Sequence, residues 1–135
     1  MATFNKFNSF VEALAEKVHN LGSDQLKVAL TNVAPSASNT TLSNITEISY
    51  ANLSSRNITT SASAQSGGTY KLTLTDLVLT ASGAVPTFRY IVIYNDTATN
   101  DELIGWFDYG STITMANTDT LTLDFDATNG LLQLV

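Results

Sequence analysis

The heptapeptide Phe88-Arg89-Tyr90-Ile91-Val92-Ile93-Tyr94 decides the fold predicted for this chain. It is almost entirely apolar and is bounded by residues typical of turns, Pro86 before it and Asn95 after it. A strand with one wet face alternates apolar and polar side chains, whereas a strand covered on both faces is apolar throughout. The stretch therefore predicts a strand at the centre of the fold.

Shorter strands are predicted on both sides of this segment. Apolar and polar residues alternate in Leu26–Leu30, in Tyr70–Leu74 after the turn Gly67-Gly68, and in Leu121–Phe125, which is the period of a half-buried strand. Further strands are expected at Leu77–Leu79, Leu103–Tyr109 and Ile113–Met115, with an exposed polar strand at Arg56–Ala64, one helical turn or an irregular segment at Leu42–Ile48, and a final hairpin that turns at Thr128-Asn129-Gly130 into Leu131–Val135. Some seven to nine short strands result. We predict a single mainly β domain, residues 1–135, with an antiparallel, jelly-roll-like β-sandwich over residues 24–135.

The N-terminal segment has a different period. Between residues 3 and 21 the apolar residues step by three and four, which predicts an amphipathic helix. Thr3 is the expected N-cap and Gly22 the expected left-handed residue after the helix. Two roles are open for its narrow apolar stripe, which comprises Phe4, Phe7, Val11, Leu14, Val18 and Leu21. The helix closes one side of a sheet, or it forms a seam between three or more copies of the chain.

Composition excludes several classes of function. The 135 residues include 12 acidic and 6 basic side chains, a net charge of −6, and no cysteine. Nucleic-acid binding requires a basic stripe, so DNA and RNA are not expected partners. Disulfides and cysteine-ligated metals are excluded. No apolar run is long enough for a membrane span and no export signal is visible, so we expect no membrane partner.

Residues that could carry catalysis or bind a cation are few. The chain has one histidine, His19, without a second histidine or a cysteine to complete a catalytic or metal site, so a structural role is expected. Asp124 and Asp126 are two apart on a predicted strand, which would place them roughly 7 Å apart on one face. Acid–base work on a glycan is one interpretation, and two solvated carboxylates are the favoured one. The acidic turn over residues 95–101 has oxygen ligands without calcium-loop spacing. No enzyme activity, metal or cofactor is predicted.

Aromatic residues are concentrated in the C-terminal half, at Tyr90, Tyr94, Trp106 and Tyr109. An exposed cluster of such rings would stack on sugars. Alternation along strands sends about half of them inward, so packing in the core is the favoured interpretation.

The shortage of charge is more informative than any motif. A 14.5 kDa monomer should expose about 6,900 Å², which leaves roughly one charge per 380 Å² for the 18 charged residues. Interface cores are depleted in charge, because ions are costly to remove from water. We therefore expect part of the surface to be buried permanently against other subunits, the alternative being a threonine-rich surface with no partner.

Most of the chain after residue 25 resembles small virion structural proteins of tailed bacteriophages. The residues that carry the likeness are Leu26-Lys27-Val28-Ala29-Leu30-Thr31-Asn32, Gly67-Gly68-Thr69-Tyr70-Lys71-Leu72, Phe88 to Asp96, Leu103-Ile104-Gly105-Trp106-Phe107-Asp108-Tyr109-Gly110-Ser111, Asp119 to Phe125 and Asn129-Gly130-Leu131. The resemblance implies a capsid cement (head decoration) protein, made in the host cytoplasm, which binds the major capsid protein on the outer surface of the head, often as a homotrimer. A tail or fibre component with a glycan- or receptor-binding β-sandwich is the rival role.

Two segments are predicted to make the partner contacts, because the core of a sandwich does not need them. They are the stripe of the N-terminal helix and the polar loop over residues 31–41. The predicted contact residues are Phe4, Phe7, Val11, Leu14, Thr31, Asn32, Asn39 and Thr41.

Overall fold

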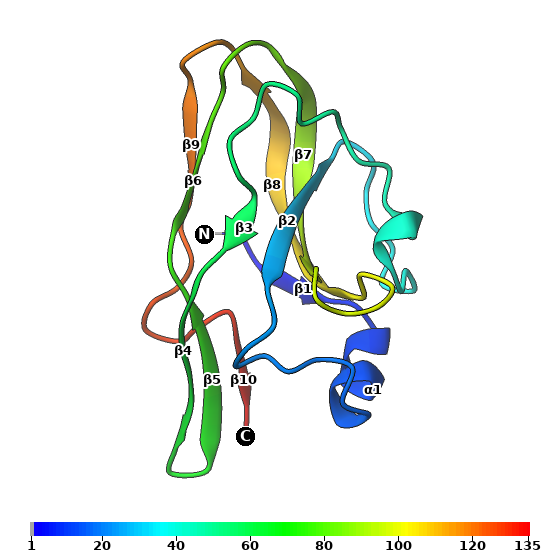
Figure 1. The fold of residues 1–135 in the computed structure, drawn as a ribbon, viewed down its shortest axis with the longest axis vertical. Coiled ribbons are helices and arrows are strands. Elements are labelled where there is room, and N and C mark those ends of the chain that lie inside the picture. Colours follow the sequence, from blue (N-terminus) through cyan, green and yellow to red (C-terminus); the bar gives the residue numbers. More distant parts are fainter. Residues whose placement is uncertain (1) are drawn as a thin grey trace.

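The structure, a computed structural model that describes residues 2–135, is mainly β and contains one α-helix within those residues (Figure 1). The prediction of an antiparallel, sandwich-like β fold with a single helix is confirmed. Ten strands are present in the described residues, one more than the predicted maximum. The elements are β1 (Phe4–Lys6), α1 (Ser9–Ala15), β2 (Leu26–Thr31), the 3-10 turn η1 (Leu42–Asn44), β3 (Asn57–Ile58), β4 (Thr60–Ser66), β5 (Thr69–Leu74), β6 (Leu77–Thr80), β7 (Val85–Asn95), β8 (Leu103–Met115), β9 (Thr120–Leu123) and β10 (Leu132–Leu134).

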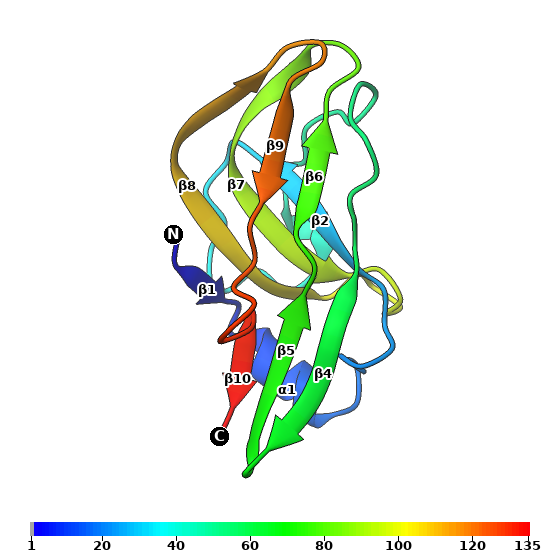
Figure 2. The same cartoon turned by 90° about the vertical axis from the view of Figure 1, so that its left-hand side faces the viewer.

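The strands form two layers, which lie side by side in Figure 1 and one in front of the other in Figure 2. One layer is a five-stranded sheet in the order β1-β8-β7-β2-β3. The other consists of two smaller sheets placed end to end, β10-β5-β4 and β6-β9, because β5 continues almost directly into β6. The main core lies between the layers and is filled from both, for example by Leu30 and Ile93 on one side and Leu72 and Leu79 on the other.

The predicted central strand is confirmed. The segment 88–94 belongs to β7, which is the middle strand of the five-stranded sheet. Its Ile91 and Ile93 enter the main core. Val92 and Tyr94 point to the opposite face, where Phe7 and Ile45 cover them. Burial on both faces explains why this stretch has no polar alternation.

Arg56 and Tyr50 cover the outer edge of β2 beyond the two residues that pair with β3. Arg56 accepts the Val28 N–H at its carbonyl (3.0 Å) and its Nη1 donates to the Val28 carbonyl (2.6 Å). The Tyr50 hydroxyl accepts the Leu30 N–H (2.9 Å), and the Arg56 guanidinium stacks on the Tyr50 ring at 3.6 Å. These groups replace the hydrogen bonds of a missing strand, which protects an edge that would otherwise pair with another chain.

The predicted helix over residues 3–21 is wrong in its bounds, since α1 covers only Ser9–Ala15. The residues around Phe4 instead form β1, which pairs antiparallel with β8. The helix ends in a Schellman motif, in which Val18 N–H donates to Ala13 O (2.8 Å) and Lys17 adopts a left-handed conformation, φ 67°. The residue that ends the helix is therefore Lys17 and not Gly22.

The predicted C-terminal hairpin is also wrong. β9 pairs with β6, and β10 pairs with β5. The turn at residues 126–130 carries the chain from the upper small sheet to the lower one. The consecutive strands β5 and β6 thus take β10 and β9 as their partners, so β9 and β10 do not pair with each other.

Candidate functional site

Three turns meet at one end of the sandwich, the upper end in Figures 1 and 2. They comprise residues 51–54, 81–87 and 115–119, and we call them the uncharged end. They contain no lysine, arginine, histidine or glutamate, and Asp119 is their one ionisable side chain. Its carboxylate accepts the Ala116 N–H at 2.8 Å, so a backbone amide of the same turn partly compensates its negative charge.

Hydrogen bonds hold the three turns against one another. The Ser82 N–H donates to Asn52 O (2.9 Å) and Asn52 Nδ2 donates to Ala84 O (3.0 Å). Ala81 bonds with the third turn, donating to Asp119 O and accepting the Thr118 N–H, both at 2.9 Å. Gly83 permits this packing, because a Cβ there would lie 2.8 Å from the Asn52 carboxamide. The turns thus form one preorganised surface.

Apart from Asp119, the exposed side chains of the uncharged end are small and neutral. They are Ala51, Asn52, Ser54, Ser82, Ala84, Pro86, Thr87, Ala116, Asn117 and Thr118. Short side chains lose little rotamer freedom when they are covered, and neutral groups avoid the cost of removing an ion from water. This surface is therefore suited to stable burial against a partner.

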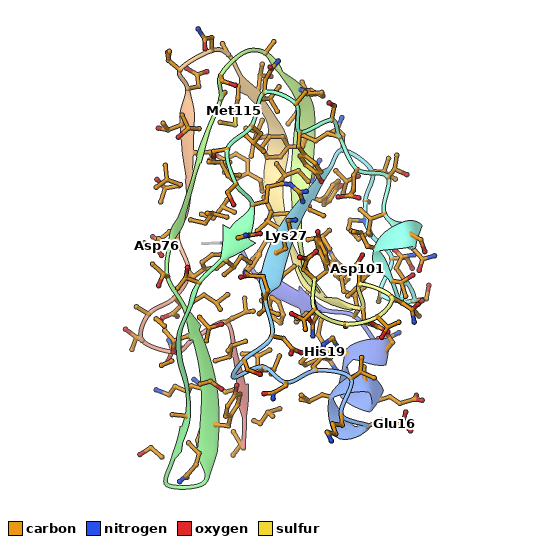
Figure 3. All side chains as sticks on the ribbon, in the orientation of Figure 1. Glu16, His19, Lys27, Asp76, Asp101 and Met115 are labelled. Atoms are coloured by element: carbon orange, nitrogen blue, oxygen red, sulfur yellow. The ribbon has the colours of Figure 1, made fainter. Side chains whose placement is uncertain are left out.

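All charged residues except Asp119 lie outside the three turns of the uncharged end. Figure 3 labels four of them, Glu16, Lys27, Asp76 and Asp101, all well below Met115 at the uncharged end. The accessible surface of 6905 Å² agrees with the area expected from the mass. Since the 18 charges are unevenly spread over it, the shortage of charge is concentrated at one end.

A groove opens beside the uncharged end, between β8 and β9. Its volume is about 460 Å³, and its walls are mostly apolar. The floor contains Ile91, Phe107 and Phe125, and the rim contains Tyr109 and Leu121. We call it the β8–β9 groove. Its lower wall includes Asp124, and no lysine or arginine lines it.

The predicted contact stripe of the N-terminal helix is divided by the fold. Phe7 is fully buried and stacks on Trp106 with ring centroids 4.6 Å apart. Phe4 is half-buried on β1 against Phe107, and Leu14 packs on the main core. Only Val11, half exposed on α1, keeps a large free surface. The four residues therefore do not form one exposed stripe.

The predicted contact loop over residues 31–41 likewise contains both exposed residues and residues that are buried or bonded within the chain. Thr31 is buried in β2. Asn39 accepts the Ser36 N–H within the loop, and Thr41 forms an isolated bridge with Glu102. Asn32 is exposed and has a free surface next to the exposed Val33.

His19 lies beyond the end of α1 and is almost completely buried. Asn95 Nδ2 donates to Asp24 Oδ2 (2.7 Å) and contacts His19 Nδ1 (3.0 Å), while Asn95 Oδ1 accepts the Thr97 and Ala98 N–H groups. Burial lowers the pKa of His19, and the carboxylates of Glu102 and Asp24 offset part of that effect. This cluster ties the segment after α1 to β7, which is a structural role.

The carboxylate pair does not have the predicted geometry, because β9 ends at Leu123, before both residues. Asp126 accepts hydrogen bonds from Asn129 N, Asn129 Nδ2 and Thr128 N, which lower its pKa. A carboxyl with a lowered pKa is a poor general acid. The pair therefore offers no support for hydrolysis of a glycan.

The acidic turn has no cation-binding geometry. Asn95 is fully buried, and its side-chain amide already makes hydrogen bonds within the chain. Asp96 Oδ1 lies 3.9 Å from Lys27 Nζ. Burial, followed by the charges of Asp96 and Glu102, raises the pKa of Asp101. Within residues 2–135 no group of three or more histidine, aspartate or glutamate side chains is arranged to hold a metal ion.

The aromatic residues are separated rather than clustered. Tyr94 and Trp106 belong to the packing beneath Phe7 on the outer face of the sheet. Tyr90 lies next to Arg89, whose guanidinium is 5.4 Å from its ring. Tyr109, which is 55% exposed, lines the β8–β9 groove instead. A sugar-binding platform made of all four rings is therefore absent.

Sequence reasoning missed both surfaces. The signal for the uncharged end is present as three runs without charge, residues 48–55, 77–88 and 109–118. What the sequence does not reveal is that the pairing of β6 with β9 and of β7 with β8 brings these runs to one end.

No protein-family model matches the chain, and neither a curated protein nor a solved structure matches it. No helix in residues 2–135 has the length and apolar character that crossing a membrane requires.

Proposed function

We propose that this protein is a non-enzymatic structural component of a tailed-bacteriophage virion, a cement protein that binds the outside of the expanded capsid. It would bridge neighbouring subunits of the major capsid protein, with homotrimers placed where those subunits meet. It would be made in the host cytoplasm. The resemblance of the sequence to small virion proteins supports this proposal.

The observation that carries the proposal is the uncharged end. A surface made of three hydrogen-bonded turns, on which Asp119 is the one ionisable side chain, suits permanent burial in a large assembly. A protein that stays free in solution gains solubility from charges distributed over its whole surface. The concentration of charges elsewhere supports one buried end and one solvated end.

The physics of an expanded shell fits such a binder. DNA packaging stretches the capsid, and a subunit whose binding surface exists only on the expanded lattice stabilises that lattice by mass action. Bridging two or more capsid subunits makes the second contact intramolecular, so modest contacts hold firmly. The net charge of −6 favours the outer face, because an inner protein would meet DNA phosphates.

The rival role, a glycan-binding tail or fibre module, has less support. Sugar recognition uses exposed aromatic rings grouped with polar side chains. Here Tyr94 and Trp106 pack on the outer face of the sheet, whereas Tyr109 lies on the opposite side.

The test is to mix the purified protein with expanded empty heads and with unexpanded heads, and to image both by cryo-electron microscopy. We expect ordered density on the outer surface of expanded heads only, at fixed symmetry positions. Heads that lack the protein should release DNA at a lower temperature. Failure to bind expanded heads, together with binding to a glycan array, would replace this proposal by the rival one.

A further inference from the structure

The β8–β9 groove lies between the free edge of β9 and an edge of β8 that β1 covers only in part. β9 pairs only with β6, and β1 covers β8 only at residues 105–107 of its thirteen. Soluble proteins protect such edges with lysine, proline, bulges or a covering segment, as Arg56 and Tyr50 protect β2 here. Residues 110–114 and 120–123 carry neither a charge nor a proline. These edges are therefore open to pairing with another chain.

β1 shows how a short segment can use this side of the sheet. It pairs antiparallel with β8 and inserts Phe4 against Phe107. The side chain of Phe4 lies against Gly105, where a Cβ would come within 2.3 Å of the ring. Ala2, just before β1, already lines the groove. Beyond it the apolar floor continues without an occupant from residues 2–135.

The charges around the groove define its occupant. Asp124 lines the lower end, and Asp76 lies beside it because its carboxylate accepts the Phe125 N–H at 2.9 Å. Asp126 follows in the next turn. Lys71 lies near Asp126, whereas Asp124 is the one charged side chain in the lining of the groove, so the complementary occupant is an apolar segment that ends in a basic residue.

A second uncharged edge strand, β4, differs from the β8–β9 groove in its surroundings. Its residues 61–66 are all exposed, and the hollow that Ser63 lines has both Lys17 and Asp24 in its walls. The β8–β9 groove offers both backbone groups and apolar surface, which is the combination that strand addition uses.

We infer that the β8–β9 groove binds an extended segment of the major capsid protein by strand addition to β9. Apolar side chains of that segment fill the floor, and a lysine or arginine at its end pairs with Asp124. The inference rests on the proposed function, since it identifies the part of the partner that the protein holds.

Hydrogen exchange on the complex with expanded heads tests this inference. The Ala81 N–H bonds to Asp119 O, so alternation along the ladder points the backbone groups of Thr120 and Thr122 away from β6. These amides should exchange quickly in the free protein and become protected on the heads. Protection confined to residues 81–87 and 115–119 would overturn the inference and leave the proposed function standing.

Variants test the side-chain and backbone contributions separately. Tyr109→Ser should weaken binding to expanded heads about tenfold, whereas Val78→Ser, a similarly exposed position on β6, should not. Thr122→Pro removes an outward N–H without touching the β6 ladder and should abolish protection of β9 at an unchanged melting temperature. Asp124→Lys should weaken binding more than Glu16→Lys, its control on α1. Equal effects within these pairs would contradict the inference.

If the heads do not bind the wild-type protein, the proposed function fails and the groove is tested alone. The ligand is then a short peptide of alternating valine and threonine with a terminal lysine, titrated by NMR. Shifts at residues 120–125 that Tyr109→Ser removes would support the groove as a strand-addition site. A titration without shifts there would overturn it.

Discussion

Asn95 fixes where the proton lies on His19. Its Oδ1 accepts two backbone N–H groups, so its Nδ2 must donate, once to Asp24 and once to His19 Nδ1. Nδ1 is therefore an acceptor, and the neutral ring carries its proton on Nε2, which is buried without a partner among residues 2–135. A second proton on Nδ1 would point at the Asn95 amide, so protonation of His19 breaks this cluster.

This arrangement predicts how stability depends on pH. Burial lowers the pKa of His19 in the folded chain, whereas the unfolded chain titrates near the ordinary value of about 6.5. Below that pH the unfolded state takes up a proton that the folded state refuses, so the free energy of unfolding decreases as the pH falls, by up to about 1.4 kcal/mol per pH unit. Urea unfolding between pH 7.5 and 5 should show this slope. His19→Gln should flatten it, and equal slopes in both proteins would contradict the prediction.

The two arginines that meet carboxylates serve different elements. Arg56 covers the edge of β2, with its Nη1 on the Val28 carbonyl and its plane on Tyr50. Arg89 forms a bidentate pair with Asp108 on an exposed face, which raises the pKa of Arg89 and lowers that of Asp108. Exposed pairs contribute little to stability, while an unpaired buried carbonyl is costly.

We therefore expect Arg56→Leu to destabilise the fold by about 1–3 kcal/mol, and Arg89→Leu by less than about 1 kcal/mol. Urea denaturation of both variants at neutral pH measures the difference. Arg56→Leu should also expose the β2 edge, so its tendency to aggregate should rise, as light scattering would show. Similar decreases in the free energy of unfolding of the two variants would mean that main-chain hydrogen bonds alone, such as Val28 N–H to Arg56 O, stabilise the edge of β2.

Elements with a strong local pattern were predictable from the sequence, and elements defined by a distant partner were not. The apolar run in β7 is sufficient by itself to predict a strand that is buried on both faces. Phe4 and Phe7 fit a helical period equally well, but one pairs with β8 and the other packs on Trp106, a hundred residues away. The short helix has too few turns to be stable by propensity alone, so tertiary contacts decide its bounds.

Across the whole molecule, the same distinction applies to the site. The shortage of charge could be counted from the sequence, and it led to the expectation of a buried face. Its position could not be derived, because the predicted contact residues Phe7 and Thr31 are used inside the chain. Three separate runs without charge become one surface only when the strands pair.

A charge placed on the uncharged end should therefore prevent assembly without harming the fold. We expect Asn117→Lys and Thr87→Lys, both at exposed positions, to weaken binding to expanded heads at least about tenfold, since an unpaired charge would be removed from water. The melting temperature should stay within about 2 °C, because exposed substitutions have small effects. Ser66→Lys, at the end of β4 beside the turn at the opposite end, is the matched control. Loss of binding in Ser66→Lys would place the contact elsewhere.

The same surface predicts that binding to expanded heads depends weakly on salt. Screening by ions acts on charged groups, and the uncharged end offers only Asp119, whose carboxylate already accepts a backbone N–H. One further ion pair at Asp124 would add at most about 1 kcal/mol, or roughly fivefold in affinity. The Kd for expanded heads should therefore change by less than about tenfold between roughly 50 and 500 mM sodium chloride, and the remaining dependence should vanish in Asp124→Asn. Sodium sulfate should strengthen binding, because it favours burial of apolar surface. A decline of several orders of magnitude in sodium chloride would show that the charged middle of the molecule, and not its neutral end, makes the contact.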